Sequence, residues 1–209
     1  MRSGIPFVVA APSGTGKTTV CQAVVERDSG IELSISHTTR PRRAAEVDGC
    51  DYHFVDAAEF RRLEAEGAFL EWAMYNDNLY GTSWAAIEGP LAAGRDVLLE
   101  IEVQGAEQVS ERRDDAPLIF LLPPSMDELR RRLEGRGTDA PAQIQKRLAV
   151  AERELEAILS FDYAVTNADL ERCIVDVLSI IAAERAGEGV AMRSRFSPAL
   201  AREQLLSAG

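Results

Sequence analysis

The sequence has few cysteines, no long apolar run and fewer basic than acidic side chains. Its three cysteines, Cys21, Cys50 and Cys173, are odd in number and far apart, which fits neither a disulfide framework nor a CxxC metal site and favours a reducing compartment. Lys and Arg number 23 against 34 Asp and Glu, a net charge of −11, which argues against a general nucleic-acid or membrane-surface binder. No stretch approaches the ~18 apolar residues of a membrane span, and the N-terminal segment lacks a signal-peptide pattern. We therefore expect a cytoplasmic protein that binds neither nucleic acid nor a membrane.

The apolar residues that are present follow an alternating strand and helix pattern. With 209 residues and 46% hydrophobic content, the chain can fill the core of one domain. Short runs that are apolar on both faces are typical of buried parallel strands, and they lie at residues 5–10, 97–101, 118–122 and 163–165. Helical patterns fall between and around them, at residues 18–27, 104–111, 126–134, 142–159 and 170–185. The sequence predicts an α/β fold with a parallel sheet flanked by helices.

Three segments interrupt this alternation within the single domain, 1–209. We assign the core to residues 1–30, 95–124 and 160–185. Residues 31–94 are polar-punctuated with one clear helix, at 57–66, and are interpreted as an inserted subdomain. Residues 125–150 are rich in Arg and Gly around a proline, a composition that suits a mobile cationic lid. Residues 186–209 are interpreted as an extension, a connector followed by a short amphipathic helix at 198–206.

A glycine-rich string connects the first predicted strand to the first predicted helix. It reads APSGTGKT over residues 11–18, and its context is that of a P-loop, although Ala11 stands where the general motif has Gly. Consecutive backbone N–H groups and the helix N-terminus would bind phosphate, Lys17 would reach the β- and γ-phosphates, and the Thr18 hydroxyl would ligate Mg²⁺. A plain glycine turn is the alternative, and the flanking strand and helix argue against it. The predicted ATP-binding residues here are Ala11, Pro12, Ser13, Gly14, Thr15, Gly16, Lys17, Thr18 and Thr19.

A second group of polar residues indicates a second anionic ligand. The run SHTTRPRR at residues 36–43 is dense in cations and hydroxyls, and Arg40 and Arg43 could bind a phosphate bidentately, although such a run is equally common as a solvated surface. Glu71 lies between Leu70 and Trp72. It is either a strand residue that faces water or an acceptor for two N–H donors. The second interpretation suits guanine, and the Thr82 hydroxyl could then donate to O6, whereas adenine would leave polar groups unpaired.

Taken together, the motifs resemble the guanylate kinase family over residues 6–185. The resemblance depends on several strings in order: APSGTGKTT, SHTTRPRRAAEVDGCDYHF, FLEWAMYNDNLYGTS, LLEIEVQGA, LPPS, RLEGRGTD, QKRL and VTNAD. It implies a P-loop NTPase core, a GMP-binding subdomain at 31–94 and an Arg-rich lid at 125–150. It also implies Mg²⁺-dependent phosphoryl transfer from ATP to GMP, and we expect dGMP to be accepted as well.

The resemblance also implies roles for individual residues. Those expected to bind the GMP phosphate are Ser36, Arg40, Arg43, Tyr52 and Tyr80, and those near the guanine are Glu71, Thr82 and Glu102. The remaining roles are Glu100 on Mg²⁺ through water, Arg136 and Arg147 as lid arginines on the ATP phosphates, and Asn167 on the adenine side. The expected catalytic charges are Lys17, Arg40, Arg43, Arg136 and Arg147. Glu100 and Glu102 depart from many relatives, which have Asp at both positions.

Two other functions fit the same fold. One is a non-catalytic protein-interaction module, in which the phosphate cradle is degraded; here Gly14, Gly16, Lys17 and Thr18 are all present. The other is a kinase of a different small phosphate ester, against which the Glu71, Tyr80 and Thr82 set argues. The oligomeric state is not predicted, and a homodimer is left open.

Overall fold

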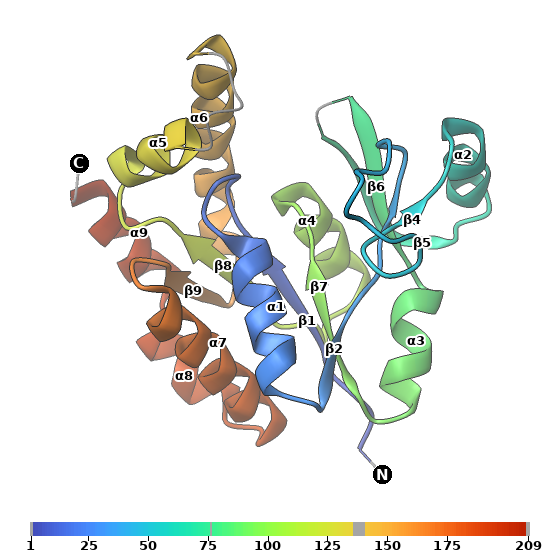
Figure 1. The fold of residues 1–209 in the computed structure, drawn as a ribbon. Helices are drawn as coiled ribbons and strands as arrows, with labels where there is room; N and C mark the ends of the chain where they lie inside the picture. The colour runs from blue at the N-terminus through green and yellow to red at the C-terminus, as the bar shows by residue number, and fades with distance from the viewer. Residues whose placement is uncertain (1, 76, 136–140, 208–209) are drawn as a thin grey trace.

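A five-stranded parallel sheet forms the centre of the computed structural model, which describes residues 2–75, 77–135 and 141–207 (Figure 1). Its strand order is β2-β7-β1-β8-β9, with every pair parallel. The strands are β1 (Pro6–Ala10), β2 (Ile31–Leu33), β7 (Asp96–Glu100), β8 (Leu118–Leu122) and β9 (Tyr163–Thr166). Strands β1 and β8 are buried along their whole length, as expected for parallel strands covered on both faces.

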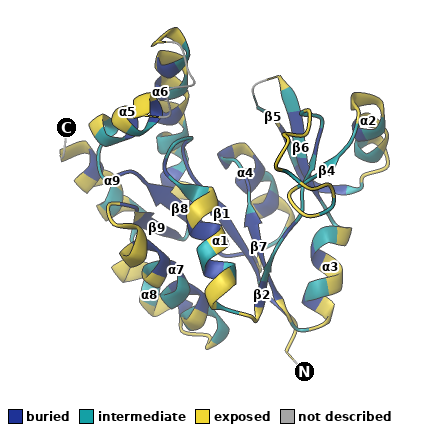
Figure 2. Ribbon diagram, viewed as in Figure 1, coloured by how far each residue is buried: buried dark blue, intermediate teal, exposed yellow. Residues whose placement is uncertain are grey.

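Helices cover both faces of this sheet (Figure 2). Alternate side chains of each strand point to opposite faces of the sheet. Phe7 and Val9 pack with α1 (Lys17–Arg27) and α7 (Leu170–Arg185), whereas Val8 and Ala10 pack with α4 (Val103–Arg112). The helices α5 (Met126–Gly135) and α6 (Pro141–Glu156) form a separate cluster, and a 3-10 turn, η1 (Ala157–Ser160), follows α6. The predicted α/β class, a parallel sheet flanked by helices, is confirmed.

A second, smaller sheet stands beside the first. Its order is β4-β3-β6-β5, built from β3 (His37–Thr38), β4 (His53–Phe54), β5 (Phe69–Tyr75) and β6 (Asn78–Ser83). Helix α2 (Ala57–Ala65) packs on it through Phe60, which meets Phe69 and Leu79 in a small core. The helix begins where Asp56 accepts a hydrogen bond from the Glu59 N–H at 2.8 Å.

The boundaries predicted for the inserted subdomain, 31–94, differ from those of the second sheet. Strand β2 pairs with β7 in the central sheet. Helix α3 (Ala85–Ala92) packs Ile87 and Leu91 into the hydrophobic core on one face of the central sheet. The second sheet therefore spans residues 37–83. Helix α3 was not predicted, because Gly89 and Pro90 inside it are both unfavourable in helices.

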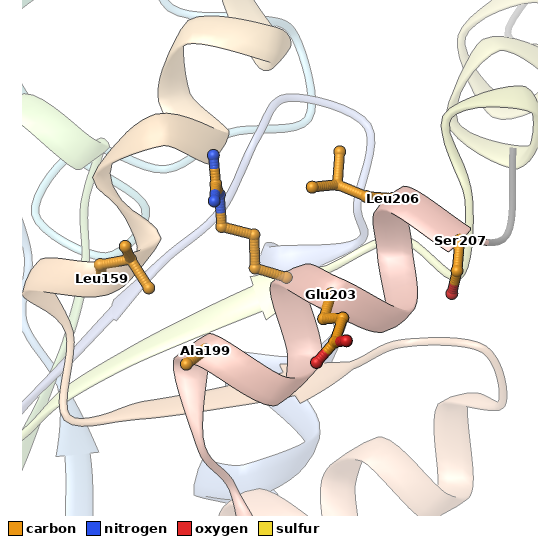
Figure 3. A pocket seen from close by; sticks show the side chains of 6 residues that line it. Leu159, Ala199, Glu203, Leu206 and Ser207 are labelled. Carbon is orange, nitrogen blue, oxygen red and sulfur yellow. The ribbon is translucent and has the colours of Figure 1, made fainter.

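The C-terminal extension packs on the central sheet. The predicted connector contains a helix, α8 (Gly189–Arg195), and the predicted final helix is α9 (Pro198–Ser207). The Ala164 N–H of the edge strand β9 donates to the Phe196 carbonyl at 2.8 Å. Leu159 and residues of α9 line an open cavity of about 490 Å³ (Figure 3). None of the predicted site residues lines that cavity.

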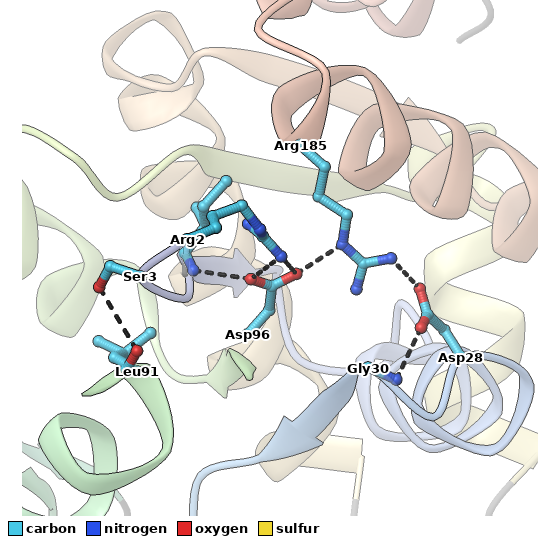
Figure 4. A network of polar contacts seen from close by, with 8 residues as sticks. Arg2, Ser3, Asp28, Gly30, Leu91, Asp96 and Arg185 are labelled. Carbon is cyan, nitrogen blue, oxygen red and sulfur yellow. Dashed lines mark hydrogen bonds and ion pairs between the residues drawn. The ribbon is translucent and has the colours of Figure 1, made fainter. Parts of the chain in front are cut away.

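The amino ends of the strands are connected by a partly buried ionic network centred on Asp96 (Figure 4). Asp96 is fully buried and accepts hydrogen bonds from Arg2 Nη2 at 2.9 Å and from the Ile5 N–H at 2.7 Å. Arg185, at the end of α7, bridges Asp96 to Asp28. Because a buried charge is costly without partners, this network holds the chain start and α7 against the sheet.

No helix of the described ranges is both long and apolar enough to cross a membrane.

Candidate active site

The loop between β1 and α1 has the backbone geometry of a phosphate cradle. Gly14 and Gly16 both have φ of 97°, in the left-handed region that favours glycine. A Cβ at Gly16 would lie 2.8 Å from Asn167 Nδ2, so a side chain is excluded there for steric reasons as well. The loop leads directly into α1 at Lys17, which places the positive end of the helix at the cradle.

Two side chains behind the loop hold its main chain. Asn167 Nδ2 donates to the Thr15 carbonyl at 2.8 Å, and Arg132 of α5 donates to the same carbonyl at 3.3 Å and to the Asn167 carbonyl at 2.9 Å. Asn167 is buried, so the structure places its amide behind the cradle. Its predicted contact with adenine stays a prediction. Arg132 was not singled out from the sequence, because nothing distinguishes it from its neighbours in the run RRRLEGRGTD.

Lys17 and Thr18 contact two carboxylates at the carboxyl end of β7: Glu100 is its last residue and Glu102 follows the strand. Lys17 Nζ donates to the Ile101 carbonyl and lies 3.3 Å from Glu102 Oε1. Burial opposes the charge on Lys17, but Glu102 and Glu100 outweigh it and raise the pKa of Lys17, so the ammonium is charged. Glu102, predicted near the guanine, therefore also contacts the lysine of the cradle.

The adjoining oxygens of Thr18 and Glu100 are suited to a hydrated divalent cation. The Thr18 hydroxyl donates to Glu100 Oε1, which brings a hydroxyl and a carboxylate together at the start of α1. Among the described residues no group of three or more His, Cys, Asp or Glu could form a metal site. A site with one or two protein oxygens fits Mg²⁺, which keeps several waters and takes further ligands from phosphates.

Arg40 is held by the carboxylate of Glu46, a residue that was not predicted from the sequence. Its Nη1 and Nη2 lie 3.0 and 2.7 Å from the two oxygens of Glu46, and its guanidinium stacks near the ring of Tyr52 at 5.5 Å. Glu46 also accepts from the Arg43 N–H at 2.8 Å, and the Arg40 hydrogen bond lowers the pKa of Glu46. Its signal in the sequence was an acidic residue three positions after the arginines, in the string RPRRAAEVDG.

Glu71 and Thr82 are brought together by the register of the β5–β6 hairpin. The two residues are paired across the strands, and the Thr82 N–H donates to Glu71 Oε1 at 2.9 Å. The Thr82 hydroxyl lies 2.9 Å from the Ser36 hydroxyl. Glu71 is 4% exposed, and burial raises its pKa to about 7. Of the two interpretations of Glu71, the structure excludes a strand residue that faces water.

An open cavity of about 460 Å³ connects the two sides. The predicted residues that line it are Ala11, Pro12, Ser13, Gly14, Gly16, Lys17, Thr18, Thr19, Ser36, Arg40, Arg43, Tyr52, Glu71, Tyr80, Glu100 and Glu102. Thr15, Thr82 and Asn167 are buried behind its walls. Glu46, Cys50 and Tyr75 line it without having been predicted to do so.

The segment predicted to be a lid, residues 125–150, approaches the cradle through α6. Arg147 Nη2 donates to the Ser13 hydroxyl at 2.6 Å, so one of the two predicted lid arginines reaches the loop. Arg136, the other, lies outside the described residues. On the same helix, burial raises the pKa of Glu154 to about 7, with a contribution from Glu102. Glu154 was not predicted from the sequence.

Taken together, these features define the class of the protein. A glycine cradle with a charged lysine faces a pocket lined by arginine, tyrosine and a buried carboxylate, and both open into one cavity. The arrangement is that of a P-loop protein in which a phosphate cradle and a second polar pocket share one cavity.

Known proteins then identify the family. The family model described as guanylate kinase matches residues 3–184. A guanylate kinase from Dechloromonas aromatica is 49% identical over 195 residues, which cover 93% of this chain and 96% of that protein. One from Thermus thermophilus is 51% identical over 202 residues, covering 97% and 91%. The crystal structure of guanylate kinase from Anaplasma phagocytophilum has a TM-score of 0.73 at 35% identity and covers 88% of this chain and 87% of that one. The chain belongs to the guanylate kinase family.

Proposed function

We propose that the protein transfers the γ-phosphoryl group of ATP directly to a phosphate oxygen of GMP, with Mg²⁺ bound and with dGMP as a further acceptor. As a member of its family, it is an ATP:GMP phosphotransferase. The observation that carries the finer proposal is the shared cavity, in which Lys17 on one side and Arg40 and Glu71 on the other face the same space.

On the donor side, the backbone of residues 11–19 would hold the ATP phosphates, with Lys17 at the β- and γ-phosphates. Thr18 and Glu100, the latter through water, would hold Mg²⁺, which neutralises phosphate charge when bound. Asn167 would support the adenine side from behind the loop. The charged state of Lys17, which Glu100 and Glu102 favour, supports this assignment.

On the acceptor side, the phosphate of GMP would be held by Ser36, Arg40, Arg43, Tyr52 and Tyr80. Glu71 would accept from the guanine N1–H and N2–H₂, Thr82 would donate to O6, and Glu102 would flank the base. Adenine presents a different edge, and each polar group left unpaired in the buried site would cost about 1–3 kcal/mol. The burial of Glu71 and its bond to Thr82 support this set.

Catalysis would come from positioning and from charge neutralisation. The acceptor oxygen of GMP is already ionised, so no general base is needed, and the task is to bring two polyanions together in line. Lys17, Arg40, Arg43, Arg136 and Arg147 would supply the positive charge. The lid at 125–150 and the GMP subdomain would close when both substrates are bound, which excludes water as a competing acceptor.

A coupled assay of ADP release tests the function. With ATP and Mg²⁺, we expect turnover with GMP and dGMP and little with AMP, CMP or UMP. Turnover with a non-nucleotide phosphate ester in place of GMP would favour a different small-molecule kinase. No turnover with any acceptor, together with retained folding, would favour a protein-interaction module.

A further inference from the structure

Helix α4 closes the outer edge of the second sheet with side chains. Strand β5 is at the edge of that sheet, and Gln108 of α4 accepts from the Trp72 N–H at 3.2 Å and donates to the Trp72 carbonyl at 2.7 Å. Arg112 donates to the Phe69 carbonyl at 3.0 Å. These are backbone groups that a neighbouring strand would otherwise satisfy. The helix that begins directly after Glu102 is thereby fixed along the strand that carries Glu71.

Gly105 is the point at which this helix meets the Glu71 side chain. Gly105 is buried, and a Cβ built on it would lie 2.5 Å from Glu71 Oε2 and 3.1 Å from Glu71 Cδ. The next atom, Ile101 Cδ1, would be 3.4 Å away, an ordinary contact. A methyl group at this position would therefore displace the carboxylate of Glu71 and little else.

The carboxylate has few other positions available. Its Oε1 is held by the Thr82 N–H at 2.9 Å, while Oε2 lies against the backbone of α4 at Gly105. Glycine is also a poor helix former, and nothing about helix formation explains it inside α4. The close approach to Glu71 gives a physical reason for the glycine of the VQGA string.

We propose that Gly105 is a positioning residue for acceptor recognition: because it has no side chain, α4 can approach Glu71 and fix the carboxylate where it meets the guanine N–H donors. The proposal rests on the proposed role of Glu71. It concerns the acceptor, because the three nearest atoms that a Cβ at Gly105 would meet belong to Glu71 and Ile101 and none belongs to Lys17 or the cradle.

The test is Gly105→Ala, with GMP affinity measured by calorimetry without ATP and with KM values for both substrates. We expect GMP binding to weaken about tenfold, which corresponds to about 1.4 kcal/mol, while the KM for ATP stays within twofold. Ser110→Ala is the matched control, since it places the same residue on an exposed position of the same helix. Wild-type GMP affinity in Gly105→Ala, or an equal change for ATP and GMP, would overturn the proposal.

A double-mutant cycle with Glu71→Asp identifies the contact. The shorter carboxylate leaves room for the methyl group, so adding Gly105→Ala to Glu71→Asp should change GMP affinity less than twofold. A further tenfold loss in that background would contradict a contact with Glu71. If the single variant Gly105→Ala does not fold, the double variant with Glu71→Asp becomes the test. Recovery of folding in the double variant supports the contact, and failure of the double variant to fold overturns it.

Glu71→Gln separates this inference from the proposed function. If Glu71→Gln leaves GMP binding unchanged, the role of Glu71 as guanine reader fails, and the inference fails with it. If Glu71→Gln selectively weakens GMP binding while Gly105→Ala does not, the positioning role of Gly105 alone is wrong.

Discussion

The two sides of the cavity are constructed differently. The proposed donor side is a continuous stretch of main chain, residues 11–18, between the fully buried strand β1 and helix α1. The proposed acceptor side is assembled from side chains of separate segments, among them Arg40, Glu71 and Thr82, on a sheet whose own core is small. Phosphate recognition by the main chain therefore needs one local string, whereas base recognition needs a correct tertiary arrangement.

This difference predicts that a change on the donor side has the largest effect on turnover. Lys17→Ala removes the charged side chain from the cradle, and we expect kcat to fall by about a thousandfold with folding retained. Lys146→Ala, on an exposed position of α6, is the control and should leave kcat unchanged. Steady-state assays with circular dichroism measure both. Retained activity in Lys17→Ala would contradict the cradle assignment.

On the acceptor side, the largest single effect should come from Glu71. Glu71→Gln replaces one acceptor oxygen with a donor, and we expect the KM for GMP to rise about 30-fold, corresponding to about 2 kcal/mol. The KM for ATP should not change. Glu107→Gln, exposed on α4, is the matched control. A parallel loss of ATP affinity would show that the two sides are not separable.

A smaller effect is expected at Glu46, which holds the Arg40 guanidinium without being part of the predicted site. Glu46→Gln keeps the size of the side chain but removes the charge, so Arg40 loses its orientation and the KM for GMP should rise about tenfold. Glu59→Gln is the matched control, because it breaks the ion pair of Glu59 with Arg62 on the solvent side of helix α2 in the same subdomain. It should leave the KM for GMP unchanged. Unaltered GMP kinetics in Glu46→Gln would mean that the phosphate orients Arg40 by itself.

The smallest effect is a pH dependence confined to the acceptor. Burial raises the pKa of Glu71 to about 7, so the carboxylate proposed to accept the two guanine N–H bonds is lost as pH falls through 7. The KM for GMP should rise by about threefold between pH 8 and pH 6.7, in line with the fraction protonated. Glu71→Gln should abolish this rise in the KM for GMP, so that the only pH dependence left comes from titration of the GMP phosphate. A pH-independent KM in the wild type would place the pKa of Glu71 lower.

The sequence predicted the central fold because its signals are local. The strands at 118–122 and the helix at 170–185 have the predicted bounds, since apolar runs and helical periodicity decide both. Helix α3 and strand β2 were not recognised: the first contains Gly89 and Pro90, and the second has only three residues.

The residues of the candidate site also differ in whether a local sequence signal predicts them. The cradle was predicted from its spacing and context, and Arg40, Arg43, Glu71 and Thr82 were candidates from their residue types, whereas Ser36 and Glu102 were assigned only through the resemblance to a family. Glu46 and Arg132 were missed because side-chain contacts distinguish them, Glu46 with the guanidinium of Arg40 and Arg132 with the carbonyl of Thr15. Such contacts depend on tertiary packing, which periodicity does not encode.

The edges of the two sheets have a consequence for self-association. An open strand offers unpaired N–H and C=O groups to another chain, and it is a template for intermolecular β-pairing. Here β2 and β4 have three and two residues, α4 occupies the free side of β5, and the carbonyl of Phe196 caps β9. Removal of the residues after Arg185 would uncover β9, and aggregation on heating is then expected to begin at that strand.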